Sequence, residues 1–264
     1  MTSTTVSEPE SKTAKRVQAA LAVCFWLAVW QLAGALVGSD LLLVSPFTVL
    51  KTLVRLVPTG AFWHTVAFSA LRIIGGFLLA LAAGVLLAAA AARLRFAEVL
   101  LQPLMLTVRS VPVASFIILA LLWLHGTGGL AVFISFLMVL PVVYANTLAG
   151  IRQADAKLLE MARVFRVPPH RRVRYVYLPA VLPPFTAACE VGLGLCWKSG
   201  VAAEVIGITT GSIGEQLYNA KVYFDTAGLF AWTLVIVLLS LAFEKVFLHL
   251  LQRAGAALTG GDGL

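Results

Sequence analysis

Residues 73–92 read IIGGFLLALAAGVLLAAAAA, a run of 20 residues without a charged side chain. A helix of that length is about 30 Å long, which is the thickness of the hydrocarbon core of a bilayer. The whole chain shares this character, since 60% of its 264 residues are hydrophobic and 12% are charged. Soluble domains carry about 25% charged residues, so this composition excludes soluble, disordered and disulfide-scaffold proteins. It predicts an all-α, polytopic membrane protein.

Six stretches are long and apolar enough to cross a membrane. The predicted spans are residues 18–38, 66–92, 99–124, 130–150, 180–207 and 227–250. Pro103 and Pro112 interrupt the third span. The first stretch is longer than the apolar region of a signal peptide, so we expect it to be retained. The predicted organisation is a disordered tail at 1–16, one transmembrane domain at 17–252 and a second tail at 253–264.

Basic residues are distributed unevenly between the two sides of this arrangement. Six spans place both termini on one side, which carries 13 Lys and Arg residues against three in the opposite loops. Lys and Arg concentrate in cytoplasmic loops, so we expect both termini to be cytoplasmic. The net charge of +8 then reflects membrane topology, and no nucleic-acid partner is expected.

Three local patterns predict packing rather than chemistry. Gly76, Ala80, Gly84 and Ala88 recur at every fourth residue and form a stripe that allows close helix packing. Residues 45–46, Ser-Pro, predict the start of a short amphipathic helix that ends near residue 58. All three cysteines lie in apolar stretches and are interpreted as packing residues: Cys24, Cys189 and Cys196.

The segment from residue 151 to 177 differs from the rest of the chain because it holds seven basic and two acidic residues. Asp155 is expected to cap a helix that runs to about Arg166, with Leu158, Ala162 and Phe165 on one face. Such a helix can lie on anionic lipid headgroups or dock into a groove on a partner protein. The pattern alone does not separate these two uses.

Residues 160–179 resemble the EAA loop of permease subunits in ABC-type importers, and we refer to them as the EAA-like segment. The family motif is Glu-Ala-Ala, three residues, Gly, nine residues, Ile, one residue, Leu-Pro. The matching positions keep this spacing: Glu160, Met161, Ala162, Arg166, Val176, Leu178 and Pro179. Met161 and Arg166 depart from the motif. An Arg at the glycine position either adopts a left-handed conformation, at a cost of about 1–2 kcal/mol, or indicates a differently built turn.

Shorter stretches are similar to the nitrate, sulfonate, taurine and bicarbonate branch of these permeases. They are residues 45–46, 69–72, 76–77, 109–112, 203–204 and 211–214. The resemblance implies a MetI-like, type I importer permease in the plasma membrane of a prokaryote. It also implies a permease homodimer, separate ATPase subunits that bind ATP and Mg²⁺, and an extracytoplasmic binding protein. The solute would be a small anion of this kind or a vitamin precursor.

The same resemblance assigns the contact with the ATPase to the EAA-like segment and its helix. The residues are Leu158, Glu160, Met161, Ala162, Phe165, Arg166, Leu178 and Pro179. The chain itself has no Gly-x-x-x-x-Gly-Lys-Ser/Thr sequence, which is the phosphate-binding loop of such ATPases. We therefore expect no cofactor on this chain and ATP hydrolysis by a partner.

Ionisable groups at membrane depth are costly and therefore mark candidate functional positions. The candidates for the translocation pathway are Lys198, Ser199, Glu190, Glu204 and Arg109. Lys198 either lines the pathway, where it would favour an anion, or pairs with a carboxylate of another helix or subunit. Arg109 either faces the inner vestibule or snorkels to the cytoplasmic surface.

No catalytic or metal-binding pattern is present in the sequence. The four histidines are scattered, and none lies beside a nucleophile or a second ligand: His64, His125, His170 and His249. An enzymatic role is therefore not expected. The alternative function is a self-contained secondary transporter whose 151–177 segment lies on the lipid surface, although such carriers usually show internal repeats, and none is evident here.

Overall fold

The computed structural model describes residues 12–39, 41–124 and 126–259. These residues form helices and connecting turns, and no strand occurs among them. The predicted all-α class is therefore confirmed. Of the predicted tails, residues 1–11 and 260–264 lie outside the described residues, whereas residues 12–16 and 253–259 are helical.

Five helices are long and apolar enough to cross a membrane: α1 (Lys12–Val37), α3 (Gly60–Arg93), α6 (Leu130–Arg152), α9 (Leu178–Gly207) and α11 (Thr226–Thr259). They correspond to five of the six predicted spans, and most of their ends lie close to the predicted ends. Three extend well beyond the prediction: α1 and α3 each begin six residues before residues 18 and 66, and α11 ends nine residues after residue 250. The apolar patterns locate the membrane segments, but the helices continue into less apolar flanks.

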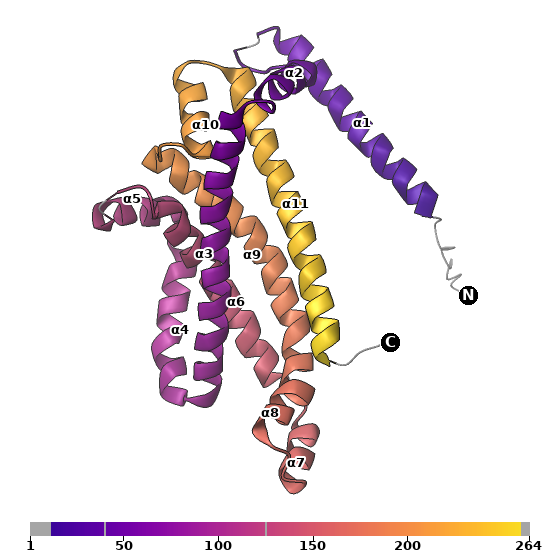
Figure 1. The fold of residues 1–264 in the computed structure, drawn as a ribbon, viewed down its shortest axis with the longest axis vertical. Helices are drawn as coiled ribbons and strands as arrows, with labels where there is room; N and C mark the ends of the chain where they lie inside the picture. Colours follow the sequence, from indigo (N-terminus) through magenta and orange to yellow (C-terminus); the bar gives the residue numbers. More distant parts are fainter. Residues whose placement is uncertain (1–11, 40, 125, 260–264) are drawn as a thin grey trace, which may run out of the picture.

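The third predicted span is not one continuous helix. It consists of α4 (Arg95–Ser110) and α5 (Val113–Trp123), which meet at an angle of 107°. Pro103 lies inside α4 without ending it, whereas Pro112 separates the two helices. A residue before proline is driven out of the helical region, and Val111 is accordingly extended, with φ −81° and ψ 132°. Figure 1 shows α5 lying across the direction of the long helices.

The short helices lie at opposite ends of the bundle (Figure 1). One end carries α2 (Pro46–Leu56) and α10 (Ile213–Val222), and the other carries α7 (Ala156–Val164) and α8 (Pro169–Arg172). A π-helical turn, η1 (Val173–Tyr177), connects α8 to α9. The predicted cap of α2 is confirmed, because the Ser45 side chain accepts a hydrogen bond from the Thr48 amide at 3.3 Å.

The core of the bundle is the packing of α3, α6 and α9. The four residues of the small-residue stripe on α3 are buried, as predicted. A Cβ added at Gly84 would lie 2.8 Å from Val143 Cγ1 on α6, so the backbones of these helices approach too closely for a larger residue. Cys189 and Cys196 are buried in this core, but Cys24 on α1 is exposed. The interpretation of Cys24 as a packing residue is therefore wrong for the isolated chain.

Helix α1 extends away from the other long helices (Figure 1). Its apolar side chains are largely uncovered, including Leu21, Trp26 and Leu32, which are 63–67% exposed. Near its end, Trp30 packs against Phe230 of α11, with ring centroids 5.6 Å apart. An apolar surface of this size requires lipid or another protein to cover it.

Candidate functional sites

The helix predicted in the 151–177 segment is α7, and its cap is confirmed. Asp155 Oδ1 accepts a hydrogen bond from the Lys157 amide at 2.8 Å. This satisfies one of the free amides at the start of the helix. Figure 1 shows α7 at the far tip of the bundle, beyond the ends of the long helices. Its position leaves most of its surface free to contact another molecule.

The apolar face of α7 is composed differently from the prediction. Leu158, Met161 and Phe165 are 42%, 49% and 74% exposed, and Glu160 is also exposed. Ala162 is only 2% exposed, so it does not share an outward face with Leu158 and Phe165. The small Ala side chain instead faces inward, where the chain turns back after the helix. The exposed apolar residues here are therefore Leu158, Met161, Val164 and Phe165, and Glu160 lies one helical turn before Val164.

The turn after α7 settles the question raised by Arg166. Arg166 adopts a left-handed conformation, with φ +51°. The Val167 amide donates to the Ala162 carbonyl at 2.9 Å, and the Arg166 amide donates to the Arg163 carbonyl at 3.0 Å. These two bonds are the Schellman motif that usually ends on glycine. The turn thus has the form expected for glycine, and Arg166 adopts it at a conformational cost.

The Leu178-Pro179 end of the EAA-like segment lies at the start of α9. Residues between α7 and α9 form the short α8 and the π-helical turn, where the Leu178 amide donates to the Val173 carbonyl. Arg172 Nε donates to the Val167 carbonyl at 2.7 Å and fixes the turn between α7 and α8. The segment is therefore a compact helical hairpin joined directly to a membrane-spanning helix.

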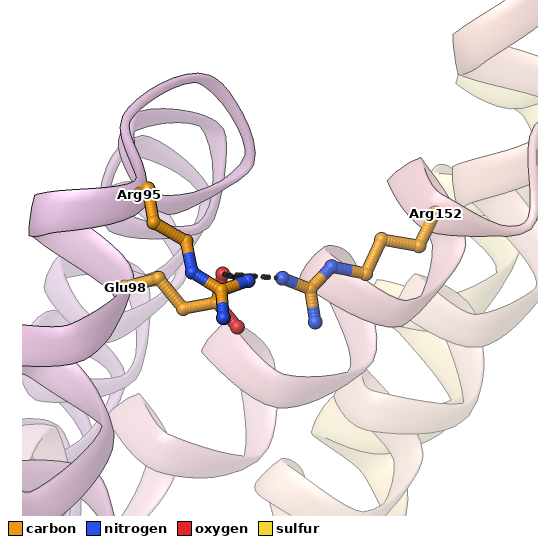
Figure 2. Close-up of polar contacts among 3 residues, drawn as sticks. All are labelled: Arg95, Glu98 and Arg152. Atoms are coloured by element: carbon orange, nitrogen blue, oxygen red, sulfur yellow. Dashed lines mark ion pairs between the residues drawn. The ribbon is translucent and has the colours of Figure 1, made fainter.

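An ion pair that the sequence interpretation missed lies at the same end of the bundle. Arg152 Nη2 at the end of α6 is 2.6 Å from Glu98 Oε2 on α4 (Figure 2). Arg95 also approaches this carboxylate, at 3.8 Å. The two partners are 54 residues apart in the chain, and no periodic pattern relates them. The sequence signal that could have indicated this ion pair is Glu98, an acidic residue at the end of the bundle where basic residues predominate.

Among the intramembrane candidates, Lys198 and Glu190 lie on the exposed side of α9. They are eight residues apart, which separates them by about 12 Å along the helix. Lys198 borders a hollow of about 350 Å³ between α9 and α11, which Trp197, Val237 and Ser240 also line. Among the described residues, no carboxylate forms an ion pair with Lys198. Within the described part of the chain, this ammonium group is uncompensated.

Two other candidates are placed differently. Ser199 is 6% exposed, and its hydroxyl donates to the Leu195 carbonyl of its own helix at 2.8 Å. Arg109 is exposed in the last turn of α4, which begins at Arg95. It therefore lies about 21 Å along the helix from the end that carries α7. This distance is longer than predicted because α4 begins before the predicted residue 99.

Glu204 is completely buried at the end of the bundle that carries α10. Its Oε2 accepts hydrogen bonds from Ser69 Oγ at 2.7 Å and from the Gly214 amide at 3.3 Å. Arg72, whose guanidinium lies 3.6 Å from the centre of the Phe68 ring, attracts the carboxylate electrostatically. Three of the stretches that resemble the permease branch, 69–72, 203–204 and 211–214, thus meet in one cluster. Glu204 connects α3, α9 and α10 and does not share the exposed face of Lys198.

Comparison with known proteins agrees with this arrangement of helices. The family described as the binding-protein-dependent transport system inner membrane component matches residues 80–255. The chain belongs to this family. The match includes the EAA-like segment and the helices on both sides of it. The permease is thus a multi-pass protein of the plasma membrane and a transport subunit, not a catalytic enzyme by itself.

Individual relatives place the permease in a branch of that family. A putative aliphatic sulfonates transport permease of Bacillus subtilis is 31% identical over 228 residues, covering 86% of this chain and 82% of the relative. A bicarbonate transport system permease of Synechococcus elongatus is 28% identical, covering 61% and 58%. A nitrate import permease of the same species is 25% identical, covering 74% and 73%. The predicted resemblance to ABC importer permeases of the nitrate, sulfonate and bicarbonate branch is confirmed.

Proposed function

We propose that the permease forms one half of the translocation pathway for a small anion. The observation that carries this proposal is the exposure of Lys198 on α9, without an ion-pair partner among the described residues. A charged side chain that faces lipid is costly. The side of α9 that carries Lys198 therefore faces a water-filled pathway or a second protein chain. The relatives named above are described as permeases for sulfonates, bicarbonate and nitrate, which are all anions.

The second half of the pathway is a second copy of the permease. Two-fold homodimers are the commonest oligomers, and a two-fold axis facing the exposed side of α9 would place two Lys198 ammonium groups around one pathway. Glu190 lies about 12 Å further toward the α7 end of the same helix. The pathway would then be positive near the middle of the membrane and negative closer to the cytoplasm.

The energy comes from ATPase subunits that bind the tip of the bundle. The exposed apolar side chains Leu158, Met161 and Phe165 project there from α7, with Glu160 beside them. A short amphipathic helix of this kind fits a groove on a partner protein. The turn at Arg166 and the hairpin with α8 hold α7 at a fixed angle to α9. Both termini and this tip lie on the cytoplasmic side, as the excess of basic residues favours.

The test is reconstitution of the purified permease in proteoliposomes, with and without the ATPase that co-purifies from its native membrane. We expect uptake of nitrate, bicarbonate or ethanesulfonate only when the ATPase, ATP and the binding protein are all present. Choline, a cation, serves as the control solute. Uptake by the permease alone would contradict the proposal and favour the secondary transporter with a lipid-surface α7.

A further inference from the structure

The ion pair between Glu98 and Arg152 has the geometry of a strong contact. The Arg152 Nη2 to Glu98 Oε2 distance is 2.6 Å, and the side chains of Glu98 and Arg152 are 18% and 52% exposed (Figure 2). Hydrogen bonds between two charged groups are shorter and stronger than neutral ones. Arg95 is a peripheral partner, since its side chain is 87% exposed and 3.8 Å away.

Arg152 lies at the base of the segment that contacts the ATPase. It is the last residue of α6, and Asp155, which caps α7, follows three residues later. Helix α6 is firmly packed, because Val139, Val143 and Leu148 are buried against its neighbours. Helix α7 connects to the bundle at two places, through Arg152 to α6 and through α8 and η1 to α9. A force applied to α7 is transmitted to α6 at Arg152.

Glu98 lies in the first turn of α4, a helix that is otherwise loosely held. Met105 and Val108 are its buried residues, and its other side leaves Leu100 and Leu104 more than half exposed. Apolar contacts give little directional attachment within a membrane, because lipid tails are equally apolar. A short ion pair at one end fixes both the position and the rotation of α4. The other end of α4 is the bend at Pro112, after which α5 crosses the bundle.

We propose that the Glu98–Arg152 ion pair makes α4 move as one body with α7. Closure of the ATPase subunits would then displace α7, Arg152 and α4 together and move the bend at Pro112. Glu98 and Arg152 act as positioning residues and touch neither solute nor ATP. This inference rests on the proposed function, since it requires an ATPase that binds α7.

The test measures the distance between spin labels on α4 and α7 in the permease–ATPase complex. The labels are attached to Leu100→Cys, whose native side chain is 62% exposed, and to Arg163→Cys, an exposed position on the side of α7 away from Leu158 and Phe165. The exposed Cys24 is replaced by alanine, whereas Cys189 and Cys196 are fully buried and inaccessible to the label. Distances are recorded in the nucleotide-free complex and after trapping with ATP and vanadate.

In the otherwise unaltered permease we expect the same label distance in both states. In Glu98→Gln, the distance should shift on trapping by more than the width of the unaltered distribution. Stimulation of ATP hydrolysis by the binding protein should fall about two- to fivefold, the range for a partly exposed ion pair. The exchange of charges, Glu98→Arg with Arg152→Glu, should restore both readouts. Arg95→Gln, which removes only the peripheral partner, should leave both unchanged.

A distance that changes on trapping in the unaltered permease would overturn the inference, as would a Glu98→Gln complex whose distance stays fixed. Arg152→Gln provides a second variant should Glu98→Gln fail to assemble, and the same outcomes apply to it. Failure of the proposed function gives a different result from failure of this inference. The unaltered permease would then bind no ATPase, and no complex could be trapped with ATP and vanadate.

Discussion

Ser69 Oγ donates a hydrogen bond to Glu204 Oε2 at 2.7 Å and accepts one from the Ile213 amide at 2.8 Å. The hydroxyl thus joins α3 to α9 and to the first residue of α10. The Gly214 amide donates to the same carboxyl oxygen at 3.3 Å, so the first turn of α10 supplies a second hydrogen bond to Glu204. This arrangement holds the short α10 against the bundle at the end opposite α7.

Replacement of Ser69 by alanine should destabilise the permease by about 1–3 kcal/mol, because it leaves the buried Ile213 amide without an acceptor and removes the shorter of the two hydrogen bonds to Glu204 Oε2. The matched control is Ser199→Ala. The Ser199 side chain is also buried, but its hydroxyl only donates to carbonyls of its own helix, so its loss should cost less than about 1 kcal/mol. Thermal unfolding midpoints in detergent measure both. Equal midpoints for the two variants would contradict a structural role for the Ser69–Glu204 bond.

The close approach of α3 and α6 predicts opposite results for two adjacent glycines. A Cβ at Gly76 would overlap the Val132 carbonyl oxygen and lie 2.9 Å from Ser135 Cβ, whereas a Cβ at Gly75 meets nothing within 4 Å. Gly76→Ala should therefore lower the unfolding midpoint, since a packed interior resists added volume by about 1–3 kcal/mol. Gly75→Ala should raise it slightly, because alanine favours the helix by about 0.5–1 kcal/mol. The same sign of change in both variants would argue against this packing.

Much of the fold was predictable from local sequence. Apolar length located the five continuous spans, the spacing of Gly76 to Ala88 predicted the buried stripe, and Asp155 and Ser45 predicted their caps correctly. These features depend on neighbouring residues, so a single sequence contains them. The bend at Pro112 was only half predicted. Two prolines were noted, but whether a proline breaks a helix depends on the surrounding packing.

The candidate sites were less predictable because they depend on contacts between distant segments. Nothing in the pattern around Glu204 distinguishes a buried anchor from a pathway residue, since its partners Ser69 and Gly214 lie on other helices. Glu98 and Arg152 also lie on different helices, so the local pattern around each does not indicate their ion pair. The inward position of Ala162 was missed for a different reason. The helical spacing fixes which residues share a face, but the turn after the helix decides which face is covered.

The left-handed conformation of Arg166 predicts that glycine will be tolerated better at this position than at a nearby position within α7. A non-glycine residue in this conformation costs about 1–2 kcal/mol, which Arg166→Gly removes. Arg163→Gly, in the last turn of α7, removes the same charge but loses about 1 kcal/mol of helix propensity. The unfolding midpoint of Arg166→Gly should therefore exceed that of Arg163→Gly by the equivalent of about 2–3 kcal/mol. The reverse order would mean that the turn does not adopt the Schellman form in solution.

Reversal of charge at Glu160 should separate ATP hydrolysis from transport. Glu160 is exposed on α7 beside the apolar face that we assign to the ATPase contact. Glu160→Lys should strongly reduce anion uptake per ATP hydrolysed, with normal expression and membrane insertion. Lys157→Glu, on the same exposed helix, is the control for a general effect of charge. Full uptake in Glu160→Lys would remove Glu160 from the proposed contact.

Removal of the charge at Lys198 distinguishes the two roles that this residue can have in the dimer. If Lys198 lines the pathway, Lys198→Met should lower uptake of nitrate or sulfonate by about 10- to 100-fold, because a charged hydrogen bond to the anion contributes about 1.5–3 kcal/mol. Lys198→Arg should retain part of the uptake, since it keeps the positive charge. Dimer stability and ATPase binding should be unchanged in both variants.

If Lys198 instead pairs with a carboxylate of the second subunit, Lys198→Met leaves that carboxylate unpaired inside the membrane. The Lys198→Met dimer should then dissociate more readily, whereas the Lys198→Arg dimer should stay associated. Uptake and dimer dissociation measured on the same two variants therefore separate a pathway residue from an intersubunit ion pair.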